Sequence, residues 1–149
     1  MPGTPRNGGR AIGLDLGDRR IGVAVCDAGR TVATPSEIVQ RVGDRPVEHD
    51  LIAEIVDRTE ATVVVVGLPL SLDGSVGPAA RKVLSEVKAL RRRLGPGGVE
   101  VVTHDERNTT TTAANSLADA GIGSRKGRGV VDQVAAAVIL QSWIDANRS

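Results

Sequence analysis

Four consecutive valines, within residues 62–67, constrain the fold of this chain more than any other feature. A strand that is apolar at every position cannot leave one face in water, so the run predicts a central parallel strand covered on both faces. One amphipathic helical pattern precedes it at residues 47–60, and another follows at residues 79–94. In the first, Val47 and Leu51 are expected to face the core and Glu48 the solvent. We therefore expect an α/β domain in which helices cover a sheet.

The segment before the first helix predicts three antiparallel strands. Residues 10–17, 21–27 and 31–39 have strand character, and turn signals at residues 18–20 and 28–30 separate them. Such short connections favour a meander. Pro35 has no backbone donor for a ladder, which places the third strand at an edge of the sheet.

The remaining elements complete a single domain. They are a strand at residues 99–103, a helix at 109–120, a glycine-rich segment at 121–129 and a last helix at 130–146. This order predicts a five-stranded mixed sheet, its first three strands antiparallel, with helices on both faces. We expect one domain over residues 10–149, preceded at residues 1–9 by a disordered arm that carries two prolines and three glycines.

Composition excludes several classes of protein. Cys26 is the only cysteine, which excludes an internal disulfide framework, and as a strand residue it is expected to be a buried, inert thiol. No apolar run approaches the roughly 20 residues of a membrane span, and residues 1–10 lack a secretory signal, so we expect a cytoplasmic protein. Trp143 is the only aromatic residue, and we expect it in the core. The lack of any other aromatic side chain disfavours binding of single-stranded nucleic acid by base stacking.

Charge is distributed unevenly along a chain whose net charge is only +1. Residues 47–60 carry five acids and one arginine, whereas residues 81–93 carry six bases and one glutamate. A basic surface of this kind suits a phosphate backbone, although a solvated helix face has the same composition. The cations that we take as candidate nucleic-acid contacts are Arg81, Lys82, Arg107, Arg125, Lys126 and Arg128.

Three carboxylates occupy positions suited to chemistry. Asp15 lies in the first strand, Glu106 follows the fifth, and Asp132 begins the last helix. Each has a plainer explanation, since Asp15 can cap the adjacent turn and the other two can favour helix N-termini. If the three converge, their oxygens suit Mg²⁺ or Mn²⁺, and two such ions support phosphodiester hydrolysis without a His, Cys or Ser nucleophile.

Other catalytic motifs are missing from the sequence. It has no Walker loop, nucleophile elbow or dinucleotide fingerprint. We expect His49 to be solvated on the acidic helix and His104 to make a structural hydrogen bond. Residues 13–17 are similar to the first phosphate loop of sugar kinases and chaperone-type ATPases, but those proteins need two such domains around a cleft, and 149 residues supply one.

Several segments together closely resemble the YqgF family. They are residues 12–17 followed by 20–24, residues 66–70 with 73–75, residues 105–107 with 109–110, and Lys126 with residues 131–140. The resemblance covers nearly all of residues 10–146. That family is described as Holliday-junction-resolvase-like and as the nuclease expected to mature the precursor of small-subunit (16S) ribosomal RNA.

The resemblance implies a ribonuclease-H-like fold and a nuclease site that holds Mg²⁺ or Mn²⁺, with two ions expected. It places the catalytic, metal-binding acids at Asp15, Glu106 and Asp132. It also implies that a substrate loop at residues 68–77, with Pro69, Asp73 and Gly74, and the segment at residues 125–128 face the nucleic acid. Departures from the family pattern at Ser71, Leu72, Val76 and Asn108 leave the three acids in place.

The implied reaction is 5′-end processing of the 16S ribosomal RNA precursor, a structured RNA. Resolution of a Holliday junction in branched DNA is one alternative, and a nucleic-acid-binding ribosome-assembly module without turnover is another. Symmetric cleavage of a junction requires a two-fold dimer, and no segment of the sequence indicates a dimer interface. Both a monomer and a homodimer therefore remain open.

Overall fold

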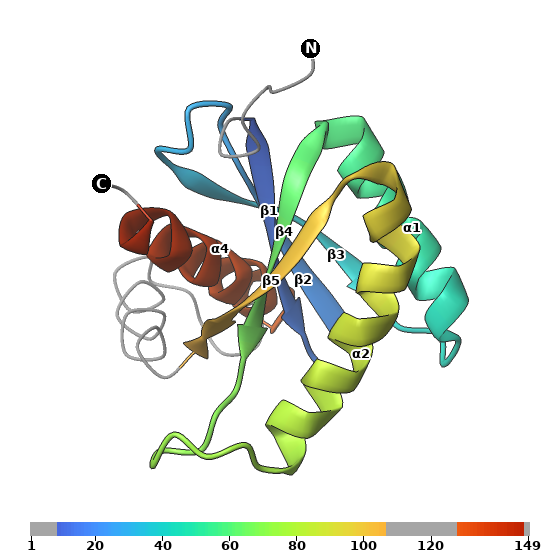
Figure 1. Ribbon diagram of the computed structural model, residues 1–149, viewed down its shortest axis with the longest axis vertical. Helices are drawn as coiled ribbons and strands as arrows, with labels where there is room; N and C mark the ends of the chain where they lie inside the picture. The colour runs from blue at the N-terminus through green and yellow to red at the C-terminus, as the bar shows by residue number, and fades with distance from the viewer. Residues whose placement is uncertain (1–8, 107–127, 148–149) are drawn as a thin grey trace.

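The computed structural model describes residues 9–106 and 128–147, with backbone alone for residues 128–132. The elements in chain order are β1 (Arg10–Leu16), β2 (Arg20–Cys26), β3 (Ala33–Gln40), α1 (Arg45–Thr59), β4 (Ala61–Leu68), α2 (Pro78–Leu94), the 3-10 helix η1 (Gly95–Gly97), β5 (Glu100–Asp105) and α4 (Arg128–Ala146) (Figure 1). The predicted helix at residues 109–120 and the predicted arm, apart from Gly9, lie outside the described residues.

The strands form one mixed sheet in the order β3-β2-β1-β4-β5. The first three strands are antiparallel, and β4 and β5 extend the sheet from β1 in parallel. This confirms the predicted five-stranded mixed sheet. Pro35 lies on the edge strand β3, beside a register shift between Val23 and Ala24 of β2, as expected for a residue that cannot donate to the ladder.

Helices cover both faces of the sheet, and the valine run contributes to both cores (Figure 1). Val64 and Val66 belong to the core that the sheet shares with α1 and α2. Val63 and Val65 belong to the core on the opposite face, under α4. Because side chains alternate along a strand, four consecutive apolar residues meet the needs of two cores at once.

Helix α4 lies unusually close to β1 where it crosses Gly13. A Cβ atom at that position would lie 2.7 Å from the carbonyl oxygen of Ala136 and 2.8 Å from the Cβ of Leu140. Only glycine, which has no Cβ atom, therefore fits at this position between strand and helix. Gly13 precedes Asp15 on β1 by two residues, so this contact fixes the position of α4 close to Asp15.

We expect Gly13→Ala to destabilise the fold by about 1–3 kcal/mol, the usual cost of overpacking a core. The added methyl group would meet the backbone of α4, so the whole helix must move outward. Urea unfolding followed through the fluorescence of Trp143, which lies on α4, measures the effect.

Gly97→Ala is the matched control for Gly13→Ala. Gly97 lies in η1 with a φ outside the left-handed region, no proline follows it, and nothing beyond its chain neighbours lies within 4 Å of a Cβ built there. The control should be about 0.4–1 kcal/mol more stable than the original protein. Equal urea midpoints for Gly13→Ala and the original protein would show that α4 does not depend on this close approach.

The buried face of α1 differs from the predicted one. Val47 and Leu51, expected to face inward, are 46% and 39% exposed, whereas Glu48 and His49, expected in solvent, are only 2% and 4% exposed. The prediction of a solvated His49 was therefore wrong. Its ring nitrogen Nε2 lies 2.8 Å from the Glu86 carboxylate of α2, a partner that is distant in sequence.

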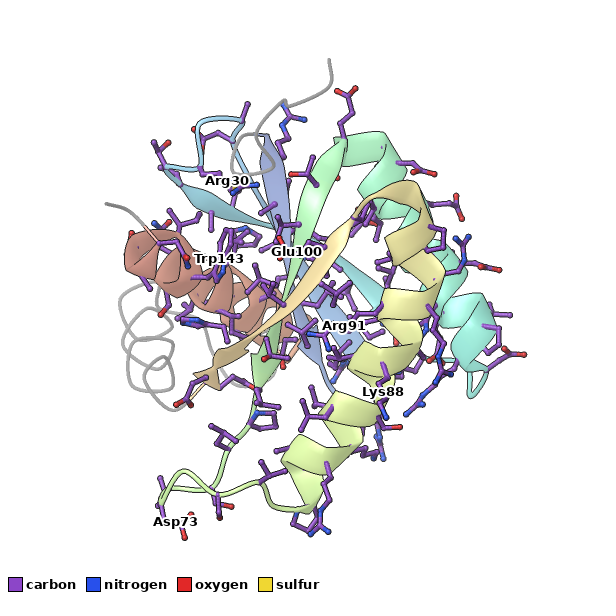
Figure 2. All side chains as sticks on the ribbon, viewed as in Figure 1. Arg30, Asp73, Lys88, Arg91, Glu100 and Trp143 are labelled. Carbon is purple, nitrogen blue, oxygen red and sulfur yellow. The ribbon has the colours of Figure 1, made fainter. Side chains whose placement is uncertain are left out.

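Smaller predictions on the core have mixed outcomes. Cys26 is buried, as predicted, and its Sγ accepts a hydrogen bond of 3.2 Å from the backbone of Ala11. Trp143, expected in the core, is only partly buried and packs against the edge of that core, with the Arg30 guanidinium 5.4 Å from its ring centre (Figure 2).

Within the described ranges, no helix is long and apolar enough to cross a membrane.

Candidate active site

Asp15 lies near the carboxyl end of β1, on the face that α4 covers. Ala11 belongs to the core under α4 and Gly13 abuts that helix, so the alternation of the strand gives Asp15 the same face. The residue directly opposite on β2 is Gly22. The amide of Gly17 donates to the carbonyls of Asp15 and Arg20, at 3.0 Å each, and thereby closes the turn that follows. Asp15 is half-buried.

Glu106 follows β5 directly and reaches back across β4. The strand between β1 and β5 is β4, and its Gly67 follows Val66, the register partner of Leu14 on β1. A Cβ atom on Gly67 would lie 2.8 Å from Cγ and 2.9 Å from Cδ of Glu106. The carboxylate of Glu106 therefore occupies the space that any other residue at position 67 would fill.

The two carboxylates are close enough to influence each other electrostatically. Burial in the first place, and then the negative charges of Asp15 and Asp105, together raise the pKa of Glu106 to about 7. A carboxyl group with such a pKa is typical of functional sites. The sequence analysis selected Asp15 and Glu106 but missed the roles of Gly67 and of the charge on Asp105. The available signal for Gly67 was its position at the end of a run of valines.

The backbone of Asp132 lies in the N-terminal part of α4, and its side chain lies outside the described residues. Ala136, one helical turn later, abuts Gly13 of β1. Toward the other end of α4, Gln141 accepts a hydrogen bond of 2.9 Å from the amide of Ala33, where β3 begins. Helix α4 thus runs from the Asp15 end of the sheet toward the opposite end.

The structure describes the side chains of two candidate nucleic-acid contacts. Arg81 and Lys82 lie exposed in the first turns of α2, and Lys82 donates to Asp18 at 2.7 Å. At the other end of α2, Arg91 donates to the carbonyl of Val101 and Arg93 to the carboxylate of Asp50, at 3.0 Å each. Arg107, Arg125 and Lys126 lie outside the described residues, and Arg128, the first residue of α4, is described by its backbone alone.

The predicted substrate loop forms a compact turn away from the sheet (Figure 2). Asp73 accepts hydrogen bonds from the amide and hydroxyl of Ser75, at 2.9 and 2.6 Å, and Gly74 has the left-handed φ of 88° that this turn requires. Pro69 lies at the base of the loop and lines a cavity next to α2. The conformation of the turn thus accounts for Asp73 and Gly74 without a ligand.

His104 shares the α4 face with Glu106. Its Nε2 lies 2.8 Å from the hydroxyl of Ser142 on α4, which confirms the expected structural hydrogen bond. Burial lowers the pKa of His104, which favours the neutral imidazole. Within residues 9–106 and the described side chains of α4, no group of three or more His, Cys, Asp or Glu residues has the arrangement of a metal site.

Known structures share this fold. Thermus thermophilus RuvC in complex with a Holliday junction substrate superposes with a TM-score of 0.59 at 18% identity, covering 93% of this chain and 94% of that one. The yeast mitochondrial Holliday junction resolvase Ydc2 gives a TM-score of 0.56 at 14% identity, covering 91% and 78%. These likenesses show the ribonuclease-H-like fold that the sequence motifs implied.

Similarity in sequence is closer. A protein named "Putative pre-16S rRNA nuclease" from Mycobacterium sp. (strain KMS) is 44% identical over 155 residues, covering 100% of this chain and 89% of the relative. Its namesake from Rhodococcus opacus (strain B4) is 47% identical over 148 residues, covering 97% and 82%. The model of the RuvX family, described as "Holliday junction resolvase", matches residues 9–146. This chain therefore belongs to the RuvX family, the family that its motifs resemble under the name YqgF.

Proposed function

We propose that the protein is a divalent-metal-dependent endonuclease that acts on structured nucleic acid, and that its reaction is 5′-end processing of the 16S ribosomal RNA precursor. The observation that carries the proposal is the approach of Asp15 and Glu106 across Gly67, at the carboxyl ends of β1 and β5. Full-length relatives that are named for this reaction support the choice of substrate. The reaction would take place in the cytoplasm.

The residues at this site fit a hard divalent cation. Asp15 and Glu106 offer carboxylate oxygens, the donors that Mg²⁺ and Mn²⁺ prefer, and the charge of Asp15 raises the pKa of Glu106. A cation bound between them would relieve that repulsion. We propose Asp15, Glu106 and Asp132 as the metal ligands, and we expect them to bind two ions.

When bound, the metal would supply activation of the attacking water and stabilisation of the leaving oxygen. The protein's own residues hold the ligands in place. Gly67 leaves the space through which Glu106 reaches Asp15, and Gly13 lets α4, which carries Asp132, lie against β1. The half-buried position of both described acids limits the access of water and strengthens electrostatic interactions.

Binding of Mn²⁺ should become tighter as pH rises from 6 to 8. Glu106 has a pKa of about 7, raised above its usual value, so the free protein carries a proton there below pH 7 that the metal must displace. A single ligand of this kind predicts an increase of about tenfold in apparent affinity between pH 6 and pH 8. Isothermal titration calorimetry in buffers of different ionisation enthalpy measures both the affinity and the protons released.

Glu106→Gln is the matched control for this pH dependence. The amide cannot titrate, so the weaker affinity that remains should change little between pH 6 and pH 8. A wild-type affinity that is constant over this range would show that Glu106 is already ionised at pH 6 or is not a ligand.

We propose that the substrate's phosphates contact Arg81, Lys82, Arg107, Arg125, Lys126 and Arg128, and that the loop with Pro69, Asp73 and Gly74 faces the substrate. The exposed position of Arg81 and Lys82 supports their part in this surface. Phosphate contacts from such side chains need no aromatic ring, which accords with a chain that has a single tryptophan.

Cleavage of a Holliday junction is the second candidate function, because the family model carries that description. Precursor RNA and a four-way DNA junction, incubated side by side with the protein and Mg²⁺ or Mn²⁺, distinguish the two. We expect cut ends in the RNA. Preferential, symmetric cutting of the junction by a dimer in the same buffer would favour resolution. RNA binding without cleavage in either metal would favour an assembly module.

A further inference from the structure

A buried ionic cluster lies outside the candidate active site, between α1, α2 and the segment that follows β3. It consists of Arg41, Glu48, His49 and Glu86, whose side chains are 16%, 2%, 5% and 6% exposed. The guanidinium of Arg41 makes two hydrogen bonds of 2.8 Å to Glu86 and one of 2.9 Å to Glu48. None of these residues belongs to the site that contains Asp15.

The hydrogen bonds of the cluster compensate for its burial. Glu48 also accepts hydrogen bonds from the backbone amides of Val42 and Gly43, at 2.8 and 3.1 Å. Burial tends to raise the pKa of Glu86, but hydrogen bonds from His49 and Arg41 outweigh it and lower that pKa to about 2. Glu86 is therefore ionised at neutral pH, and Arg41 remains fixed between two carboxylates.

Arg41 also holds the turn that follows the candidate metal ligand Asp15. Its Nε donates to the carbonyl of Gly17 at 2.8 Å, and its backbone amide donates to the carbonyl of Arg19 at 2.9 Å. The amide of Gly17 in turn donates to the carbonyl of Asp15. A chain of hydrogen bonds thus connects the cluster to the backbone of Asp15.

Packing fixes only part of this turn. Leu16 packs against the core under α1 and α2, but Leu16 and Gly17 also line a cavity of about 420 Å³, together with Arg41 and Pro69. Apolar side chains of similar volume would stabilise a core at least as well as a buried ion pair. The distinctive contribution of Arg41 is directional, since one planar guanidinium joins the turn to α1 and α2 at the same time.

We propose that Arg41 is a positioning residue for Asp15: by joining the carbonyl of Gly17 to Glu48 and Glu86, it sets the orientation of the carboxyl end of β1. This inference rests on the proposed function, in which Asp15 is a metal ligand. Partners that orient a ligand typically change metal affinity by about 10–100-fold when they are replaced.

Arg41→Lys is the sharpest test, because lysine keeps the positive charge beside Glu48 and Glu86 but cannot also donate to Gly17 with the same geometry. We expect the Gly17 amide to exchange with solvent about tenfold faster, the effect of losing one hydrogen bond to a charged group. Mn²⁺ should bind about tenfold more weakly, and kcat should fall with little change in KM for nucleic acid. NMR hydrogen exchange, calorimetry and cleavage kinetics supply these readouts.

Arg93→Lys is the control, since Arg93 lies on α2, the helix that carries Glu86, and pairs with exposed Asp50 at 3.0 Å, at the other end of α2 from Lys82, which pairs with Asp18 of the turn. If Arg41→Lys does not fold, the neutral triple variant Arg41→Met, Glu48→Gln, Glu86→Gln replaces it, with the same expectations. Exchange and Mn²⁺ affinity within twofold of the control overturn the inference, provided that Asp15→Asn loses Mn²⁺ binding. If Asp15→Asn binds Mn²⁺ as the original protein does, the metal site itself is wrong, and this inference falls with it.

Discussion

Asp15→Asn is expected to lower the cleavage rate by about 10³-fold, the scale on which enzymes depend on one electrostatic group at the reaction centre. Asparagine has nearly the same shape, so β1 and its turn should remain in place while the negative charge disappears. Mn²⁺ binding should weaken in parallel. The pKa of Glu106 should fall, because the charge of Asp15 is one of the causes that raise it.

Three measurements on the same Asp15→Asn sample test this expectation: cleavage with Mn²⁺ present, calorimetric Mn²⁺ binding and urea unfolding. Asp50→Asn is the matched control, because Asp50 is an exposed carboxylate on α1 that pairs with Arg93 of α2. It should keep full activity. Undiminished cleavage by Asp15→Asn, after a contaminating nuclease has been excluded, would remove Asp15 from the site and the metal mechanism with it.

Local sequence patterns were sufficient to predict most of the sheet. The valines at positions 63–66 specify a strand that needs cover on both faces, and Pro35 limits its own strand to an edge. These inferences succeed because each depends on a residue's own chemistry and on its immediate neighbours. The same patterns predicted β3 from residue 31, whereas its ladder begins at Ala33.

Predictions failed where a side chain's partner is distant in the sequence. The sequence pattern predicted Glu48 and His49 to be solvent-facing residues of an acidic helix. Both are buried, because Glu48 accepts a hydrogen bond from Arg41 and His49 pairs with the Glu86 carboxylate, which accepts. No pattern within α1 could indicate a partner 37 residues away. A polar residue can be buried when it is satisfied in this way, and only the tertiary structure shows whether it is.

In the candidate site, too, some features could be predicted from the sequence and others required the tertiary structure. Asp15 and Glu106 could be selected from sequence because carboxylates at strand ends are unusual and costly to bury. Their approach to each other depends on β4 lying between β1 and β5 and on Gly67 being its residue at that level. The importance of Gly67 therefore emerges only when three strands are placed side by side.

Gly67→Ala is expected to lower cleavage by about a hundredfold, the effect of misplacing a catalytic group by about 1 Å. The new methyl group would lie 2.8–2.9 Å from Cγ and Cδ of Glu106 and 2.5 Å from Cδ1 of Ile139. These atoms belong to flexible side chains, so the fold should survive while Glu106 moves away from Asp15. The pKa of Glu106 should fall as that carboxylate gains solvent and distance from Asp15.

A second substitution separates the displacement of Glu106 from simple overpacking by Gly67→Ala. Ile139→Val removes the Cδ1 atom that the methyl group would strike, but leaves the contact with Glu106 unchanged. In the double variant Gly67→Ala, Ile139→Val we expect the urea midpoint to recover and the cleavage rate to stay low. Ile139→Val alone should remain active and lose about 0.5–1.5 kcal/mol of stability. If the double variant recovers activity along with stability, then packing at α4, rather than the placement of Glu106, is what Gly67 protects.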